Sequence, residues 1–173
     1  MAKAKKNKTA KKPAPGGRVG GIKVLLVNRK VRHQYEVLKS FEAGVVLQGS
    51  EVKSIRDGNV QWADAHARYD ERSGELWLWG LHIGEYGHAN YFNHVPAAPR
   101  KLLLHKREIL AIQGMIQTKG VTVVPRQIHL RRGFIKMDIC VVRGKKLVDK
   151  RRDIQKRDQE REARREMVRR NRM

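Results

Sequence analysis

Residues 34–58 read QYEVLKSFEAGVVLQGSEVKSIRDG, and the change of pattern within this stretch decides the fold. Aromatic, β-branched and other apolar residues run through its first part, which predicts one or two extended segments over about 34–48. Ser50 then suits a helix N-cap and Gly58 suits the stop, so we expect a short helix at Glu51–Asp57. A strand that leads into a short helix is therefore the unit on which we build the rest of the fold.

A hairpin is predicted further along the chain, where Ala65–Tyr69 and Glu75–Leu81 flank the turn residues Arg72-Ser73-Gly74. Side chains alternate across a strand, so Trp77 and Trp79 share one face of the second segment and the intervening leucines take the other. We expect both tryptophans to lie in the core or at its rim.

The remaining body alternates loop, helix and strand signals. Gly, Asn and Pro mark residues 84–99 as a long loop, and apolar residues at helical spacing predict a helix within Lys101–Gly120. Two more strands are predicted at about 121–130 and 134–142, with Pro125 at a sheet edge or a bend. Many short antiparallel strands with flanking helices predict a mainly β fold, with a small oligonucleotide-binding-type barrel as the candidate.

The charge of the chain indicates its class of partner. The net charge is +22 and the sequence pI is about 10.8, which favours a polyanion, and nucleic acid before a membrane. No apolar run is long enough to span a bilayer, so we expect no membrane partner. The single cysteine, Cys140, allows no internal disulfide, fits a reducing, cytoplasmic location and reads as a small buried hydrophobe.

Charge also divides the chain into three parts. Residues 1–21 are predicted to be a disordered basic leader, residues 22–142 the folded β domain, and residues 143–173 a basic C-terminal tail. The tail carries fourteen Lys/Arg and six Asp/Glu, and its ion pairs stand at helical spacing with too little apolar surface for a core. We expect it to be disordered when free and helical when bound to a polyanion; the alternative is a solvated tail that only aids solubility.

Signals for catalysis are weak. Seven scattered histidines have no cysteine partner at zinc spacing, and no Gly-rich phosphate loop follows a strand. Glu42 and Glu51 could form an acid–base pair, but structural pairing with Lys53 or Arg56 is the stronger interpretation. The sequence therefore predicts neither an enzyme nor a metal or cofactor site.

Three separated motifs resemble one family. The run FEAGVVLQGSEVKSIR at 41–56 is similar to the signature of the small protein B family, bacterial proteins that bind transfer-messenger RNA. The same holds for RKLLLH at 100–105 and for RGKK at 143–146 followed by DKR at 149–151. Asn28-Arg29 and His33-Gln34-Tyr35 also match, so the resemblance covers about residues 22–173.

The resemblance implies a function in ribosome rescue. Proteins of this family bind the tRNA-like domain of transfer-messenger RNA and deliver it to the A site of stalled ribosomes for trans-translation. The protein stands in for the anticodon arm, near the small-subunit decoding centre, and its tail enters the empty message channel. Alanyl-tRNA synthetase and the tRNA-delivering elongation factor act on the same RNA. The family implies no enzymatic activity, and we expect a monomer.

Candidate RNA-binding residues come from these motifs and from the basic body. Those expected to bind RNA are Asn28, Arg29, His33, Tyr35, Glu42, Lys53, Arg56, Lys101, Leu103, His105 and Lys136. Those expected at the decoding centre or in the tail are Gly144, Lys145, Lys146, Val148, Asp149, Lys150 and Arg151. Val148 stands where some relatives place an aromatic residue or histidine, so it offers apolar contact without stacking.

Several roles stay open at this point. Glu42 either accepts from a base amino group or a 2′-hydroxyl, or holds a neighbouring Lys or Arg. Leu103 and His105 are expected to alternate on one strand, and so are His33 and Tyr35, which form either an aromatic platform for a base or part of the core. The alternative function is that of a general ribosome-associated RNA-binding protein or RNA chaperone. A major-groove DNA reader is disfavoured because Glu51–Asp57 is short for that role.

Overall fold

The structure is a computed structural model that describes residues 18–19, 21–89 and 93–145 together with Gln159 and Met167. The strands are β1 (Arg18–Val19), β2 (Ile22–Val27), β3 (Tyr35–Val45), β4 (Val60–Gln61), β5 (His66–Asp70), β6 (Glu75–Trp79), β7 (His82–Ile83), β8 (Arg100–Leu103), β9 (Val121–Arg131) and β10 (Phe134–Gly144). The helices are α1 (Arg29–Gln34), α2 (Gly49–Arg56) and α3 (Lys106–Ile116).

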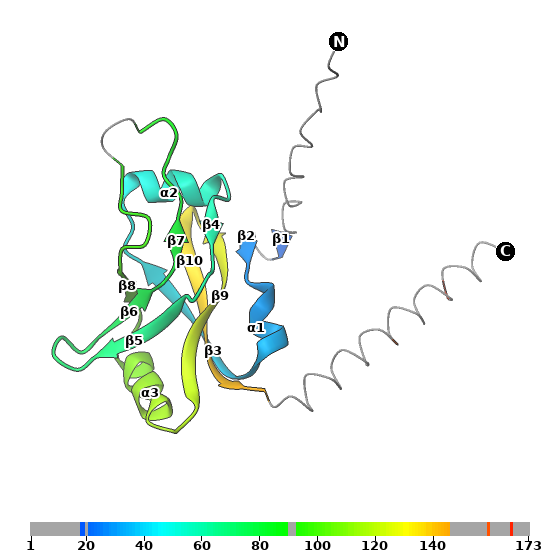
Figure 1. The fold of residues 1–173 in the computed structure, drawn as a ribbon, viewed down its shortest axis with the longest axis vertical. Helices are drawn as coiled ribbons and strands as arrows, with labels where there is room; N and C mark the ends of the chain where they lie inside the picture. Colours follow the sequence, from blue (N-terminus) through cyan, green and yellow to red (C-terminus); the bar gives the residue numbers. More distant parts are fainter. Residues whose placement is uncertain (1–17, 20, 90–92, 146–158, 160–166, 168–173) are drawn as a thin grey trace, which may run out of the picture.

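One antiparallel sheet organises the molecule. Its strand order is β1-β2-β9-β10-β3-β8-β6-β5, and β5 also pairs with β9 through Ala67 and Val123. The strands from β9 round to β5 therefore form a ring of hydrogen-bonded neighbours. The short pair β4–β7 makes a second sheet, and α2 and α3 lie at opposite ends of the molecule (Figure 1). The prediction of a mainly β, antiparallel fold with a few helices is confirmed.

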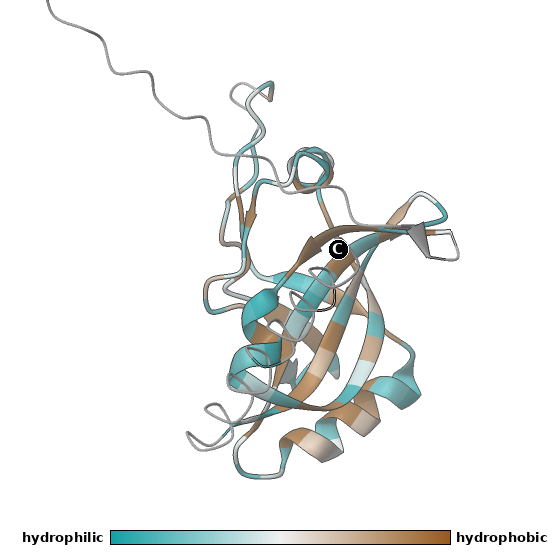
Figure 2. Ribbon diagram, turned by 90° about the vertical axis from the view of Figure 1, so that its right-hand side faces the viewer, coloured by the Kyte–Doolittle hydropathy of each residue, from teal (hydrophilic) through white to brown (hydrophobic). Residues whose placement is uncertain are grey.

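Two clusters of apolar side chains hold the sheet together. The main core contains Leu76, Leu78, Ile128 and Ile139, all fully buried, and each such side chain contributes about 1.5–3 kcal/mol on burial. The smaller cluster joins Val31, Val124, Cys140 and Val142 beneath α1, so Cys140 is the buried small hydrophobe that the sequence predicted. Hydrophobic and hydrophilic residues alternate along the long strands (Figure 2).

The predicted hairpin forms between β5 and β6, and its leucines, which lie on the strand face opposite the tryptophans as expected, are the residues that pack into the core. Trp77 is half-buried and Trp79 is 43% exposed. Both indoles lie on the outer face of β6, because Leu76 and Leu78 take the inner face. Neither indole lies in the core, so of the two expected positions only the rim remains open for the tryptophans.

Pro125 lies inside β9, which has β2 and β10 on its two sides. The β9–β10 register shifts between Asp138 and Ile139, which pair with Gln127 and Pro125 and leave Arg126 as the extra residue of a bulge. The bend predicted at Pro125 is confirmed, whereas an edge strand is wrong. Proline has no N–H to donate, and it is tolerated here because the pairing of β2 with β9 ends at Gln127, so β2 needs no hydrogen-bond donor at Pro125.

Helix α2 begins earlier than predicted. Its N-cap is Gln48, whose backbone N–H donates to Glu51 Oε2 at 2.7 Å. The expected cap, Ser50, instead has its hydroxyl 3.0 Å from His94 Nδ1, so a tertiary contact takes the side chain that would have capped the helix. The helix ends at Arg56 with Asp57 as its C-cap.

Two expected strand alternations are also wrong. His33 lies on α1, which the Asn28 side chain caps by accepting from Lys30 N–H at 3.2 Å. His105 is the N-cap residue of α3 and follows the end of β8. Only Tyr35 and Leu103 of the two predicted pairs lie on strands. Strand β10 continues two residues beyond the domain boundary expected at 142, and β1 recruits two residues of the expected leader into the sheet.

Candidate nucleic-acid interface

Glu42 lies at the centre of a polar cluster on the outer face of β3. Its neighbours Phe41 and Ala43 point into the core, so its carboxylate points outward. Arg131 donates to one carboxylate oxygen at 2.7 Å, and His129 Nε2 lies 3.2 Å from the other. Burial alone would raise the pKa of Glu42, but Arg131 and His129 together outweigh it and lower that pKa. Glu42 is therefore held as an anion beside a cation.

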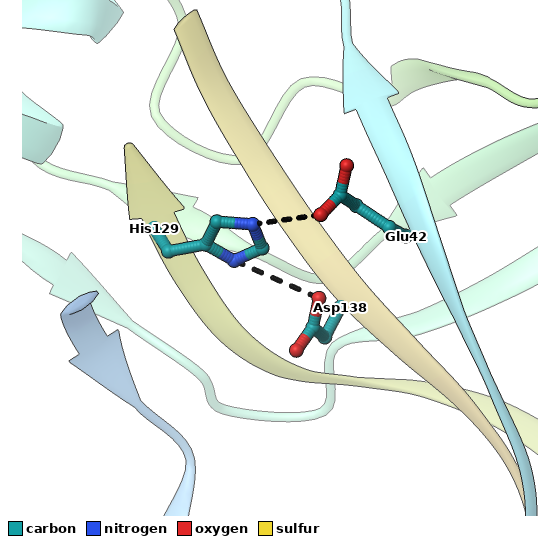
Figure 3. A group of neighbouring side chains, drawn as sticks. All are labelled: Glu42, His129 and Asp138. Atoms are coloured by element: carbon teal, nitrogen blue, oxygen red, sulfur yellow. Dashed lines mark hydrogen bonds and ion pairs between the residues drawn. The ribbon is translucent and has the colours of Figure 1, made fainter. Parts of the chain in front are cut away.

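His129 and Asp138 support this arrangement from the next two strands (Figure 3). The imidazole of His129 is buried, and its Nδ1 lies 3.6 Å from Asp138 Oδ1, too far for a good hydrogen bond. Gln127 Nε2 donates to the other Asp138 oxygen at 2.6 Å. Burial raises the pKa of the Asp138 carboxyl, which His129 and Gln127 partly oppose. Groups from β9 and β10, of which the His129 imidazole is buried, thus fix the position of Glu42 on β3.

Among the residues that the structure describes, Glu42, His129 and Asp138 are also the group whose spacing could suit a metal ion, because one ligand atom of each lies within 4.8 Å of the others. The two carboxylates contact different ring nitrogens: Glu42 faces Nε2 and Asp138 faces Nδ1 (Figure 3). An ion bound to one ring nitrogen would thus take the place of one carboxylate contact, while the other carboxylate stays at the other nitrogen. The arrangement fits a hydrogen-bonded support for Glu42 better than a convergent metal site.

A groove of about 320 Å³ adjoins this cluster on the same face. Gly44, two residues after Glu42 on β3, forms part of its floor, and a Cβ there would lie 3.2 Å from Leu103 Cβ and 3.6 Å from Lys136 Nζ. Leu103 is 50% exposed, and Phe134 at the groove's side is 72% exposed. Arg56 reaches the groove from α2. Cations above an apolar floor suit a phosphate backbone with a sugar or base packed beneath it.

The structure thus brings together Glu42, Arg56, Leu103 and Lys136 from the predicted set. Lys53 is exposed on α2, where its Nζ lies 5.1 Å from the centre of the Tyr86 ring. Lys101 lies on β8, two residues before Leu103, and forms an ion pair with Glu75. His105 is exposed at the start of α3.

A second group of predicted residues lies at α1, away from the groove. Asn28 is buried; besides capping α1, its amide donates to the Pro125 carbonyl at 3.2 Å. Both ends of that amide are engaged by the protein, which gives Asn28 a structural task. Arg29 is exposed on α1, His33 is half-buried there, and Tyr35 packs against the smaller core. The core interpretation of Tyr35 is the one that these contacts support.

The start of the predicted tail is attached to the same region. Gly144 pairs with Tyr35 at the end of β10. Lys145 donates its backbone N–H to Gln34 O and its Nζ to Arg32 O, each at 3.0 Å. The other predicted tail residues, Lys146, Val148, Asp149, Lys150 and Arg151, lie outside the described residues.

Sequence reasoning missed several partners. Arg131 and His129, not Lys53 or Arg56, hold Glu42. Glu51 forms a buried ion pair with Arg100 at 2.7 Å, so the pairing expected for it is also wrong. The signal available for the Glu51–Arg100 pair was that Arg100 begins the RKLLLH motif, which suggests a structural or functional role for its side chain. Within the described residues, no helix is long and apolar enough to cross a membrane.

Comparison with known proteins identifies the family. The family described as SmpB protein matches residues 25–169, most of the chain. The chain belongs to the SmpB family. An SsrA-binding protein of Corynebacterium urealyticum is 46% identical over 164 residues, which cover 95% of this chain and 90% of that protein. One from Desulfitobacterium hafniense is 49% identical over 145 residues, which cover 84% and 92%.

A solved structure agrees with the SmpB assignment. It is described as "tmRNA-SmpB: a journey to the center of the bacterial ribosome", and one of its chains is 44% identical to this one. The two chains superpose with a TM-score of 0.61, over 70% of this chain and 85% of the other. The antiparallel sheet described above is therefore the fold of this family, with Glu42 and the adjoining groove on its outer face.

Proposed function

We propose that this SmpB-family chain binds transfer-messenger RNA and acts with it in trans-translation on stalled ribosomes. The observation that carries the proposal is that Leu103, Lys136 and Arg56 line one groove, with Glu42 beside it on β3, two residues before Gly44. Two of these residues come from the 41–56 motif and one from the 100–105 motif, which stand far apart in the sequence. The relatives named as SsrA-binding proteins support the same partner.

The chemistry of this face suits a folded RNA. Lys136 and Arg56 neutralise phosphates, and each such contact releases counterions, which makes affinity fall with salt. Leu103 and Phe134 offer apolar surface to a ribose or an unstacked base. Glu42 accepts hydrogen bonds from a base amino group or a 2′-hydroxyl, the group that distinguishes RNA from DNA. Arg131 and His129 hold the Glu42 carboxylate ready for that contact.

The finer account extends this proposal. The ring of strands is a small barrel of the oligonucleotide-binding type, and its outer face takes the tRNA-like domain, so that the protein stands in for the anticodon arm in the A site. The basic tail after Lys145 is disordered when free and becomes helical in the empty message channel, where Asp149, Lys150 and Arg151 lie near the decoding centre. The protein acts as a cytoplasmic monomer without a catalytic activity of its own, and alanyl-tRNA synthetase and the tRNA-delivering elongation factor act on the RNA that it carries.

The test compares two exposed leucines. Leu103→Asp places a negative charge in the groove, whereas Leu110→Asp makes the same change on α3, where Leu110 is 55% exposed. Both side chains are about equally exposed, so neither substitution buries a charge in the core. We expect only Leu103→Asp to weaken binding of a tRNA-like domain transcript in a gel shift, by tenfold or more. Equal binding by both folded variants, as checked by circular dichroism, contradicts the site.

A general RNA chaperone would share the charge and the sheet. It would bind unrelated RNAs about as well as the tRNA-like domain, and Leu103→Asp would weaken all of them alike. The competition of unlabelled total tRNA against the labelled transcript separates the two functions in the same gel shift.

A further inference from the structure

A row of cationic and aromatic side chains crosses the outer face of β5, β6 and β8. In the strand register Arg68 stands opposite Trp77, and Trp77 stands opposite Lys101 on its other side. His66 stands opposite Trp79 in the next row of the same face. The inward positions of these strands are taken by Ala67, Leu76, Leu78 and Leu102, all buried, so the row faces solvent.

The row borders a shallow hollow of about 410 Å³. It is lined by Arg68, Tyr69, Asp70, Trp77, Trp79 and Pro99. Trp79 is 43% exposed and Arg68 is exposed. Within the described part of the chain, Lys101 is paired with Glu75, whereas no ion pair is found for Arg68.

The side chains of this row suit a ligand that carries both bases and phosphates. Two large indoles on a solvent-facing strand leave apolar surface in water, which is typical of a binding surface. Nucleotide bases stack on such rings whatever their sequence, and a neighbouring cation holds the phosphate. Trp77 and Trp79 are two residues apart on one strand, about 6.6 Å, so they can receive successive bases of an extended strand. The charges around the hollow are mixed, since Asp70 lines it beside Arg68 and Glu75 pairs with Lys101. The net charge of +22 of the whole chain favours an anionic ligand, and the two exposed rings favour one that carries bases, so RNA fits better than an acidic or apolar protein segment.

The row also continues the candidate interface. Leu103 and Lys101 both point outward from β8, since Leu102 between them is buried. Leu103 borders the groove and Lys101 borders Trp77. An RNA seated at the groove therefore has a path along β8 to the tryptophans.

We propose that Trp77 and Trp79 form a stacking platform for unpaired nucleotides of the RNA seated at the groove, with Arg68 bound to their phosphate. The proposal rests on the proposed function for the identity of that RNA. It adds a second contact region, on strands that the sequence motifs of the family do not include.

Variants of the full-length protein test the platform with two probes, a tRNA-like domain transcript and a single-stranded oligoadenylate octamer. Trp79→Leu removes the ring and keeps an apolar side chain, while Trp79→Phe keeps a ring. We expect Trp79→Leu to weaken octamer binding about tenfold, within the range for one lost base stack, and Trp79→Phe to retain most of the affinity. Trp62→Phe, a change at a half-buried residue packed on the core, is the matched control and is expected to bind as the wild type does.

Salt dependence separates stacking from charge. Trp79→Leu is expected to leave the slope of log affinity against log salt unchanged, because stacking releases no counterion. Arg68→Gln is expected to reduce that slope by about 0.7, the value for one phosphate contact on a single strand. The tryptophan fluorescence of the wild type should be quenched by the octamer, and less so in Trp79→Leu.

Wild-type affinity of folded Trp79→Leu for both probes, without loss of quenching, overturns the platform and leaves a protein partner for this face. If the wild type binds the octamer through Trp79 but does not bind the transcript, the platform stands and the proposed function fails. If the transcript is bound and Trp79→Leu changes nothing, the function stands and the platform is wrong.

Discussion

Arg100→Met is expected to destabilise the fold by about 3–5 kcal/mol, because it leaves the Glu51 carboxylate buried without its cation. The two side chains are only 2% and 5% exposed and are joined at 2.7 Å. The guanidinium also donates to the backbone carbonyls of Leu81, Ala98 and Pro96, which lose these bonds in the variant. The loss is a large share of the roughly 5–15 kcal/mol by which a domain is stable.

The neighbouring residue provides the control. Lys101 pairs with Glu75, but their side chains are 36% and 30% exposed, so Lys101→Met should cost only about 0–1 kcal/mol. Urea unfolding followed by circular dichroism measures both values, and thermal melts should show Arg100→Met lower by roughly 6–20 °C. Equal, small losses for the two variants would refute the reasoning that burial makes the Arg100 pair different.

A double variant completes this test. Glu51→Leu combined with Arg100→Met removes both charges, so the penalty of an unpaired buried ion disappears and part of the lost stability should return. The recovery will be incomplete because Glu51 also accepts from Gln48 N–H at the start of α2. Since α2 carries Arg56 to the groove, Arg100→Met should also weaken RNA binding, and the double variant should restore part of it.

Three further predictions concern charge and the tail. The pKa of the Glu42 carboxyl is lowered in the folded protein, so the stability that its ion pairs add is fully present above its ordinary pKa of 4.5. This stability is lost as the pH falls through the lower pKa of the folded state. Acid unfolding should therefore show the wild type losing at most about 1 kcal/mol relative to Glu42→Gln. Lys136→Gln should reduce the slope of log affinity against log salt by about 0.7–0.9, while unchanged slope would exclude a phosphate contact. Ending the chain after Lys145 should leave affinity for the tRNA-like domain within a few-fold and abolish tagging of a non-stop reporter; equal loss of both would show that the tail is only part of the RNA clamp.

Local patterns were sufficient for the elements that depend on local chemistry. The β5–β6 hairpin followed from a Ser-Gly turn between alternating apolar residues, and β9 and β10 followed from two long β-branched runs around Arg132-Gly133. Helix α1 was not predicted. It has only six residues, too few to show helical periodicity, and the burial of Val31 that stabilises it depends on tertiary packing, so Asn28 as a candidate N-cap was the signal available.

The partners within the site depend on strand register, which the sequence does not specify. Glu42 meets His129 and Arg131 across 87 and 89 residues of chain because β10 aligns β3 with β9. Ser50 meets His94 across 44 residues, which displaced the expected cap. The family motifs predicted Glu42, Leu103 and Arg56 as site residues, but only the structure shows how they are arranged around Gly44.

The central claim is that this chain selects transfer-messenger RNA through the face that carries Glu42 and Leu103. The most direct measurement is recovery of RNA from total bacterial RNA by the immobilised wild-type chain beside Leu103→Asp and Leu110→Asp. We expect the wild type and Leu110→Asp to enrich transfer-messenger RNA far above all other species and Leu103→Asp to lose that enrichment. Broad recovery of ribosomal and transfer RNAs by the wild type, unchanged in Leu103→Asp, would contradict the account.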